Sequence, residues 1–175
     1  MSKKKCILIN MEDDERMPVG KHVNILALDI ATRTGYCYGK GDNLKFGHYI
    51  IPKKYDYDGI KFFHFSVWVQ EMIRRHKPEA IAIEKPFVRG YSTFYLFGLC
   101  AVAEAIAASF DVPIVKVTPN TIKKSFTGSG KASKLDMLNR ALEKGYNVTV
   151  DDEADAIALH QYVQTQIHFD LDKEE

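Results

Sequence analysis

Two short, wholly apolar segments that each end in a carboxylate constrain the fold of this chain most. Residues 25–28 read Ile-Leu-Ala-Leu and lead into Asp29, and residues 80–83 read Ala-Ile-Ala-Ile and lead into Glu84. Continuous apolar runs of this length are typical of central strands that are buried on both faces of a sheet. The sequence therefore predicts two buried strands, each with an acidic residue at its end.

The segments around these strands predict an α/β fold with a mixed sheet. The other expected elements are strands at residues 36–38, 44–51 and 113–117, helices at 57–76, 91–110, 131–144 and 151–167, and a short helix from Pro119. Three antiparallel strands followed by strand–helix crossovers imply a sheet of about five strands with helices on both faces. Leu135, Leu138 and Leu142 form one apolar stripe, and helix 91–110 is expected to bury Phe94 and Tyr95.

The composition of the whole chain and of its terminal segments indicates how the chain is organised. A hydrophobic content of 46% excludes disorder as the dominant state, and a formal net charge of +1 neither favours nor excludes a nucleic-acid partner. Residues 1–22, Lys-rich and then acidic, are expected to be an appendage, flexible or with one edge strand. Residues 23–168 are expected to form the domain and residues 169–175 an acidic tail.

The cysteines and the hydropathy pattern indicate the compartment. Cys6, Cys37 and Cys100 are odd in number and far apart, which argues against a disulfide framework and for a reducing environment. The longest nearly apolar run, residues 96–110, contains Glu104 and is too short to span a membrane. We therefore expect a soluble, cytoplasmic protein without a membrane partner.

Acidic residues stand where three predicted elements begin or end. Ligands gather at the carboxyl ends of parallel strands, so Asp29 and Glu84 would lie side by side there if their strands are parallel neighbours. In the last helix, Asp155 shares a face with both Asp151 and Asp152. Any one of these residues could simply form a turn or cap a helix, the interpretation we favour for Asp151 and Glu153. Taken together, the strand-end and helix-start acids favour a functional site.

The chemistry of such a pocket favours a divalent metal ion. Carboxylates held close together repel one another unless a cation neutralises them. Oxygen ligands without His or Cys spacing suit Mg²⁺ or Mn²⁺, and two such ions per site can stabilise both the attacking and the leaving oxygen in phosphodiester cleavage. The hypothesis is two-metal phosphodiester hydrolysis.

Four segments in order carry a resemblance to a known family. Residues 25–36, 82–87, 128–134 and 152–158 resemble the motifs of the RuvC-type Holliday junction resolvases, which have a ribonuclease H-like fold. The resemblance covers residue 24 to about residue 166. The turn after Asp29 is one residue shorter than the family's usual form and lacks its Pro-Gly, and the N-terminal arm is extra. The chain therefore resembles a divergent or phage-type member.

The resemblance assigns roles to particular residues. It implies that Asp29, Glu84, Asp152 and Asp155 are the catalytic metal ligands, and it selects Asp152 over Asp151. It also implies that Lys134 assists at the scissile phosphate. Lys123 matches a family lysine in the preceding helix, and Phe87 matches the aromatic residue that contacts junction bases.

Basic residues near these motifs predict a DNA-binding surface. Lysines cluster around Gly128-Ser-Gly130, and the loop after Glu84 interleaves basic and aromatic residues, an arrangement that suits phosphates and unpaired bases. Surface lysines are more often only solvated, and the string here lacks the glycine spacing of a P-loop. The residues expected to contact DNA are Phe87, Arg89, Lys123, Lys124, Lys131 and Lys134.

The resemblance implies a Mg²⁺- or Mn²⁺-dependent endonuclease that resolves four-way DNA junctions by paired nicks leaving 5′-phosphates. Symmetric nicking requires two sites at a fixed separation, so a homodimer is expected, with helix 91–110 contributing to its interface. Cleavage-sequence preference and a branch-migration helicase partner are left open.

Three other functions share features with this sequence. A nuclease of the same fold with broader selectivity for flaps and branches would use the same site. A non-catalytic junction-binding protein would leave the four carboxylates unexplained. The turn from Asp29 to Gly35 is also similar to the first phosphate loop of the sugar kinase, chaperone and actin superfamily, but that fold needs a second similar domain, which 175 residues do not supply.

Overall fold

The computed structural model describes residues 6–8, 22–53, 57–86 and 93–169. Its main sheet has five strands in the order β4-β3-β2-β5-β6. These are β2 (Ile25–Asp29), β3 (Arg33–Lys40), β4 (Asn43–Ile50), β5 (Ala80–Glu84) and β6 (Ile114–Val117). The strands β2, β3 and β4 are antiparallel neighbours, and β2, β5 and β6 run parallel. The predicted mixed α/β sheet is confirmed.

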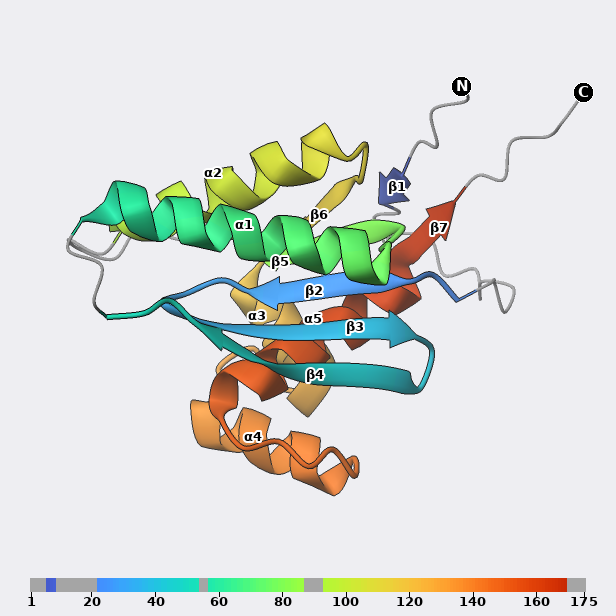
Figure 1. Cartoon of the computed structure of the whole chain (residues 1–175). Coiled ribbons are helices and arrows are strands. Elements are labelled where there is room, and N and C mark those ends of the chain that lie inside the picture. Colours follow the sequence, from blue (N-terminus) through green and yellow to red (C-terminus); the bar gives the residue numbers. More distant parts are fainter. Residues whose placement is uncertain (1–5, 9–21, 54–56, 87–92, 170–175) are drawn as a thin grey trace, which may run out of the picture.

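Helices cover both faces of this sheet (Figure 1). The helices α1 (Asp58–His76) and α2 (Thr93–Ser109) lie on one face, and α3 (Pro119–Thr127), α4 (Lys134–Glu143) and α5 (Asp151–Gln166) lie on the other. A separate two-stranded sheet pairs β1 (Cys6–Leu8) with β7 (Ile167–Phe169). The rest of the predicted appendage and of the acidic tail lies outside the described residues. No helix in the described ranges is long and apolar enough to cross a membrane.

The central strands are buried because their side chains point alternately into two hydrophobic cores, one on each face of the sheet. Ile25 and Ala27 of β2 pack on the side of α5, whereas Leu26 and Leu28 pack on the side of α1 and α2. On the α5 side the contacts involve small residues such as Ala82 of β5, together with several alanines of α5. Small side chains let a helix approach a sheet closely, so α5 is held directly against the strands that carry the acidic residues.

Two of the sequence predictions about α4 were wrong. Helix α4 begins at Lys134 rather than at residue 131, because Ser133 caps it and exchanges hydrogen bonds with Asp136. Its buried side is formed by Met137 and Ala141, so Leu135 and Leu142 of the predicted stripe are exposed.

In α2, Phe94 is 77% exposed, against the expectation of a buried side chain. Tyr95 is partly buried as expected, and its ring stacks on that of Phe62 in α1. The buried side chains of α2 come later in the helix, at Leu99, Cys100, Ala103 and Ala107.

Candidate active site

The carboxyl ends of β2 and β5 bring two of the predicted site residues to one edge of the sheet. Leu28 pairs with Ile83 in parallel register, and the next residue of each strand is Asp29 or Glu84. Parallel neighbours leave the sheet at the same edge, so both acids emerge side by side. The sequence made this arrangement conditional on parallel neighbouring strands, and β2 and β5 meet that condition.

Helix α5 adds its carboxylates to the same edge because it packs closely on β3. Gly35 of β3 is the register partner of Asp29, and the backbone of Asp152 lies against it with no room for a Cβ atom. A glycine at this position therefore lets the first turn of α5 reach the end of β2. Asp152 lies in that turn, and Asp155 follows three residues later, on the same face of the helix.

Mutual repulsion and burial set the electrostatics of the site. Burial raises the pKa of Asp29 well above its ordinary value, and the charges of Asp155, Glu84 and Asp152 raise it further. Burial and the charge of Asp155 raise the pKa of Glu84 to about 7. Burial also raises the pKa of Asp155 to about 6. The structure thus brings together the four carboxylates that the sequence analysis singled out.

Two lysines oppose this repulsion. The charge of Lys134, the first residue of α4, lowers the pKa values of Asp29 and Asp155. Lys123 of α3 acts in the same direction on Glu84 and Asp155. Both lysines that the resemblance singled out therefore lie within electrostatic reach of the carboxylates.

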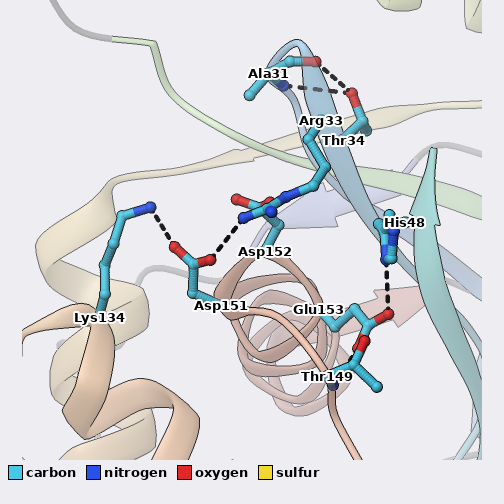
Figure 2. Close-up of polar contacts among 9 residues, drawn as sticks. All are labelled: Ala31, Arg33, Thr34, His48, Lys134, Thr149, Asp151, Asp152 and Glu153. Atoms are coloured by element: carbon cyan, nitrogen blue, oxygen red, sulfur yellow. Dashed lines mark hydrogen bonds and ion pairs between the residues drawn. The ribbon is translucent and has the colours of Figure 1, made fainter. Parts of the chain in front are cut away.

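A polar network that was not predicted from the sequence surrounds the start of α5, as Figure 2 shows. Arg33 Nη2 donates to Asp151 Oδ1 at 2.8 Å, and Arg33 Nε donates to Asp152 Oδ2. Lys134 Nζ donates to the other Asp151 oxygen, so Asp151 lies between two cations. The hydrogen bond and charge of Lys134 hold the pKa of Asp151 below its ordinary value. The sequence feature that could have indicated this network is Arg33, a basic residue in the short turn after Asp29.

A tight turn fixes the position of the Arg33 backbone. The Thr34 hydroxyl donates to the Ala31 carbonyl at 2.7 Å and accepts from the Ala31 N–H at 3.3 Å, as Figure 2 shows. Thr34 is fully buried, whereas the Arg33 side chain is 41% exposed. The turn is therefore anchored while the guanidinium extends toward α5.

Glu153 has a structural role, as the sequence analysis favoured. Its Oε2 accepts from the Thr149 backbone N–H at 2.7 Å, and its Oε1 lies 2.9 Å from His48 Nδ1 on β4. Burial would raise the pKa of Glu153, but the hydrogen bonds from Thr149 and His48 dominate and hold it below its ordinary value. These contacts tie the start of α5 to the sheet.

The donor set suits a hard divalent cation. Within the described residues, Asp29, Glu84 and Asp155 make no hydrogen bond or ion pair with a basic side chain, although their charges repel one another. A divalent ion would neutralise them with oxygen ligands alone. In the described ranges, no three His, Cys, Asp or Glu side chains are already arranged to hold an ion. The oxygen donors of these residues therefore suit a divalent ion, although in the described residues the side chains are not positioned to coordinate one.

The remaining predicted DNA contacts fall into two groups. Lys124 and Lys131 are exposed, and neither contacts a site carboxylate in the part of the chain that the structure describes. Phe87 and Arg89 lie outside the described residues.

Comparison with known proteins places the chain in a family. A family model described as crossover junction endodeoxyribonuclease RuvC matches residues 47–161, a range that includes Glu84, Asp152 and Asp155 and begins after Asp29. A crossover junction endodeoxyribonuclease RuvC of Prochlorococcus marinus (strain MIT 9303) is 35% identical over 106 residues, which are 58% of this chain and 69% of that protein. A relative of that name from Pseudothermotoga lettingae is 36% identical over 96 residues, 52% of this chain and 59% of that protein.

Solved structures share the fold. RuvC of Thermus thermophilus, in a structure with a Holliday junction substrate, superposes with a TM-score of 0.65 at 20% identity, covering 82% of this chain and 92% of that one. The yeast mitochondrial Holliday junction resolvase Ydc2 gives a TM-score of 0.62 at 14% identity, covering 85% and 80% of the two chains. With the strand-end carboxylates and the matched family model, these likenesses lead to one conclusion: the chain belongs to the RuvC family of crossover junction endodeoxyribonucleases.

Proposed function

We propose that this protein resolves four-way DNA junctions by metal-dependent hydrolysis, with Asp29, Glu84, Asp152 and Asp155 holding two Mg²⁺ or Mn²⁺ ions. The observation that carries the proposal is that burial and mutual repulsion raise the pKa values of Asp29, Glu84 and Asp155 at one sheet edge. Membership of the RuvC family supplies the reaction class.

The bound ions and the protein side chains would have different roles in the proposed reaction. The bound ions would supply the positive charge and Lewis acidity that activate a water molecule and stabilise the cleaved phosphodiester. The carboxylates hold those ions against the sheet edge. Lys134, already close to Asp29 and Asp155, would neutralise negative charge that develops on the phosphate oxygens. Nicking would leave 5′-phosphates.

The proposed DNA contacts surround this centre. Lys123 is within electrostatic reach of Glu84. Lys124 and Lys131 are exposed and lie close to Lys123 in the sequence, so these three lysines would bind flanking phosphates. Phe87 and Arg89 follow Glu84 directly in the chain and would contact bases at the junction centre.

We also propose that the protein acts as a homodimer, since paired nicks require two sites at a fixed separation. Phe94 and Phe97 of α2 are 77% and 43% exposed, and Phe63 of the neighbouring α1 is 61% exposed. Large exposed apolar side chains on adjacent helices are typical of an interface.

The test is a cleavage assay with purified protein and end-labelled DNA. A four-way junction, a fork and a linear duplex are each incubated with Mg²⁺ or with EDTA. The proposal predicts paired nicks in the junction with Mg²⁺, none in EDTA, and products that DNA ligase can rejoin. Junction binding without cleavage would indicate a non-catalytic binding protein, and equal cleavage of forks and junctions would indicate a broader nuclease.

A further inference from the structure

One guanidinium group already binds a carboxylate of the proposed metal site. Arg33 Nε donates to Asp152 Oδ2, and Arg33 Nη2 donates to Asp151 Oδ1 at 2.8 Å. The side chain of Asp152 is only 10% exposed, so its charge is poorly screened by water. The positive charge of Arg33 therefore replaces much of the hydration that Asp152 has lost.

The other carboxylates of the site lack such a partner. In the described ranges, Asp29, Glu84 and Asp155 have no hydrogen-bonded cation, and the ion pairs of the Arg33 guanidinium are with Asp151 and Asp152. A divalent ion and a guanidinium compete for the same oxygen lone pairs and for the same negative charge. Because a guanidinium stays protonated in proteins, Arg33 is a permanent competitor.

Resting on the function proposed above, we propose that Arg33 is a built-in counter-cation that occupies Asp152 in the metal-free protein and gives up that contact when a divalent ion binds. Arg33 then sets the metal affinity of the site as a positioning residue. Asp151 retains Arg33 during the exchange, because it accepts a separate hydrogen bond from the same guanidinium. The 41% exposure of Arg33 leaves it room to move off Asp152.

A purely structural role for Arg33 makes the opposite prediction. If Arg33 served only to fasten the turn to α5, its removal would loosen Asp152 and weaken metal binding. If Arg33 competes with the ion, its removal strengthens metal binding. The sign of the change in affinity therefore separates the two roles.

The experiment is a Mn²⁺ titration of the full chain without DNA, with free Mn²⁺ followed by electron paramagnetic resonance. We expect Arg33→Ala to bind Mn²⁺ about three- to fivefold more tightly than the unmodified protein, the upper part of the range of a partly exposed ion pair. Arg75→Ala is the matched control, since Arg75 pairs with Glu71 at the far end of α1, and it should bind Mn²⁺ as the unmodified protein does. Unchanged or weaker binding by Arg33→Ala would overturn the proposal.

Two further variants keep the test decisive. Arg33→Lys retains the charge but not the paired hydrogen bonds, so it should fold even if Arg33→Ala does not, and it should bind Mn²⁺ about two- to threefold more tightly. In an Asp152→Asn background, Arg33→Ala should change the affinity less than about twofold, because the competitor has lost its carboxylate. A full gain in that background would show that Arg33 does not act through Asp152.

The same titration separates this proposal from the proposed function. If the unmodified protein binds no Mn²⁺, or Asp29→Asn binds it equally tightly, the metal site itself is wrong. If Asp29→Asn weakens binding and Arg33→Ala does not strengthen it, only the role of Arg33 is wrong.

Discussion

The backbone of Asp152 lies so close to Gly35 that a Cβ atom on Gly35 would be 1.9 Å from the Asp152 carbonyl oxygen. Since Gly35 is also the strand partner of Asp29, this contact sets how closely a helix carboxylate approaches a strand carboxylate. The absence of a Cβ atom at Gly35 thus governs the geometry of the candidate site.

Gly35→Ala should therefore damage both stability and activity. The added methyl group must push α5 away from β3, which we expect to cost about 1–3 kcal/mol in the free energy of unfolding and to abolish junction cleavage. Chemical denaturation and the cleavage assay measure the two effects. Gly59→Ala is the control, because a Cβ there meets only the exposed Tyr57 ring, and it should leave both properties intact. Normal cleavage by Gly35→Ala would contradict the close packing.

Lys134 is expected to act in cleavage rather than in folding. Its side chain is 73% exposed, so losing its ion pair with Asp151 should change stability little. Losing its charge beside the phosphate should lower the cleavage rate about 10²–10³-fold. Single-turnover cleavage by Lys134→Ala, compared with Lys45→Ala at an exposed lysine on the edge strand β4, measures the difference. Equal rates for the two variants would exclude the assigned role.

The raised carboxyl pKa values predict an unusual pH dependence of stability. In the metal-free protein Glu84 keeps its proton up to about pH 7, whereas in the unfolded chain it loses that proton near 4.5. The folded state thus holds more protons, and the contribution of Glu84 to stability falls as the pH rises through this window.

Glu84→Gln removes this penalty and provides the measurement. In EDTA, the melting temperature of Glu84→Gln minus that of the unmodified protein should increase between pH 5 and pH 8. A difference that stays constant over this range would show that Glu84 is not destabilised by burial and by Asp155.

The proposed dimer predicts that one apolar surface controls association. Replacing both Phe94 and Phe97 by Glu should weaken self-association at least about tenfold, because buried aromatic side chains dominate interface energies. Sedimentation equilibrium measures the effect. Leu142→Glu is the control, since Leu142 is a similarly exposed apolar residue on α4, and it should not alter association. A monomeric unmodified protein would refute the dimer.

Local patterns predicted much of this fold because they report burial directly. The apolar runs that end at Asp29 and Glu84 identified the two central strands, whereas their parallel pairing entered only as a condition, which the structure meets. Both acids were recognisable because a carboxylate at the end of a buried strand conflicts with its surroundings.

The remaining features depend on tertiary contacts that no local pattern reports. Arg33 and Asp151 are 118 residues apart, and an arginine in a turn looks like an ordinary solvated residue. Leu135 and Leu142 had the spacing of a buried stripe, but α4 packs through Met137 and Ala141 instead. A short helix at the edge of a domain buries only one narrow side, and the sequence does not say which one.

The central claim is that Asp29, Glu84, Asp152 and Asp155 jointly hold divalent ions, and Mn²⁺ affinity tests it most directly. Each residue is replaced in turn by its amide, and Asp42→Asn, an exposed turn residue, is the control. We predict that each of the four variants binds Mn²⁺ about tenfold or more weakly than the unmodified protein, since each removes an oxygen ligand and a negative charge, and that Asp42→Asn binds it normally. Unchanged Mn²⁺ affinity in all four variants would contradict the account.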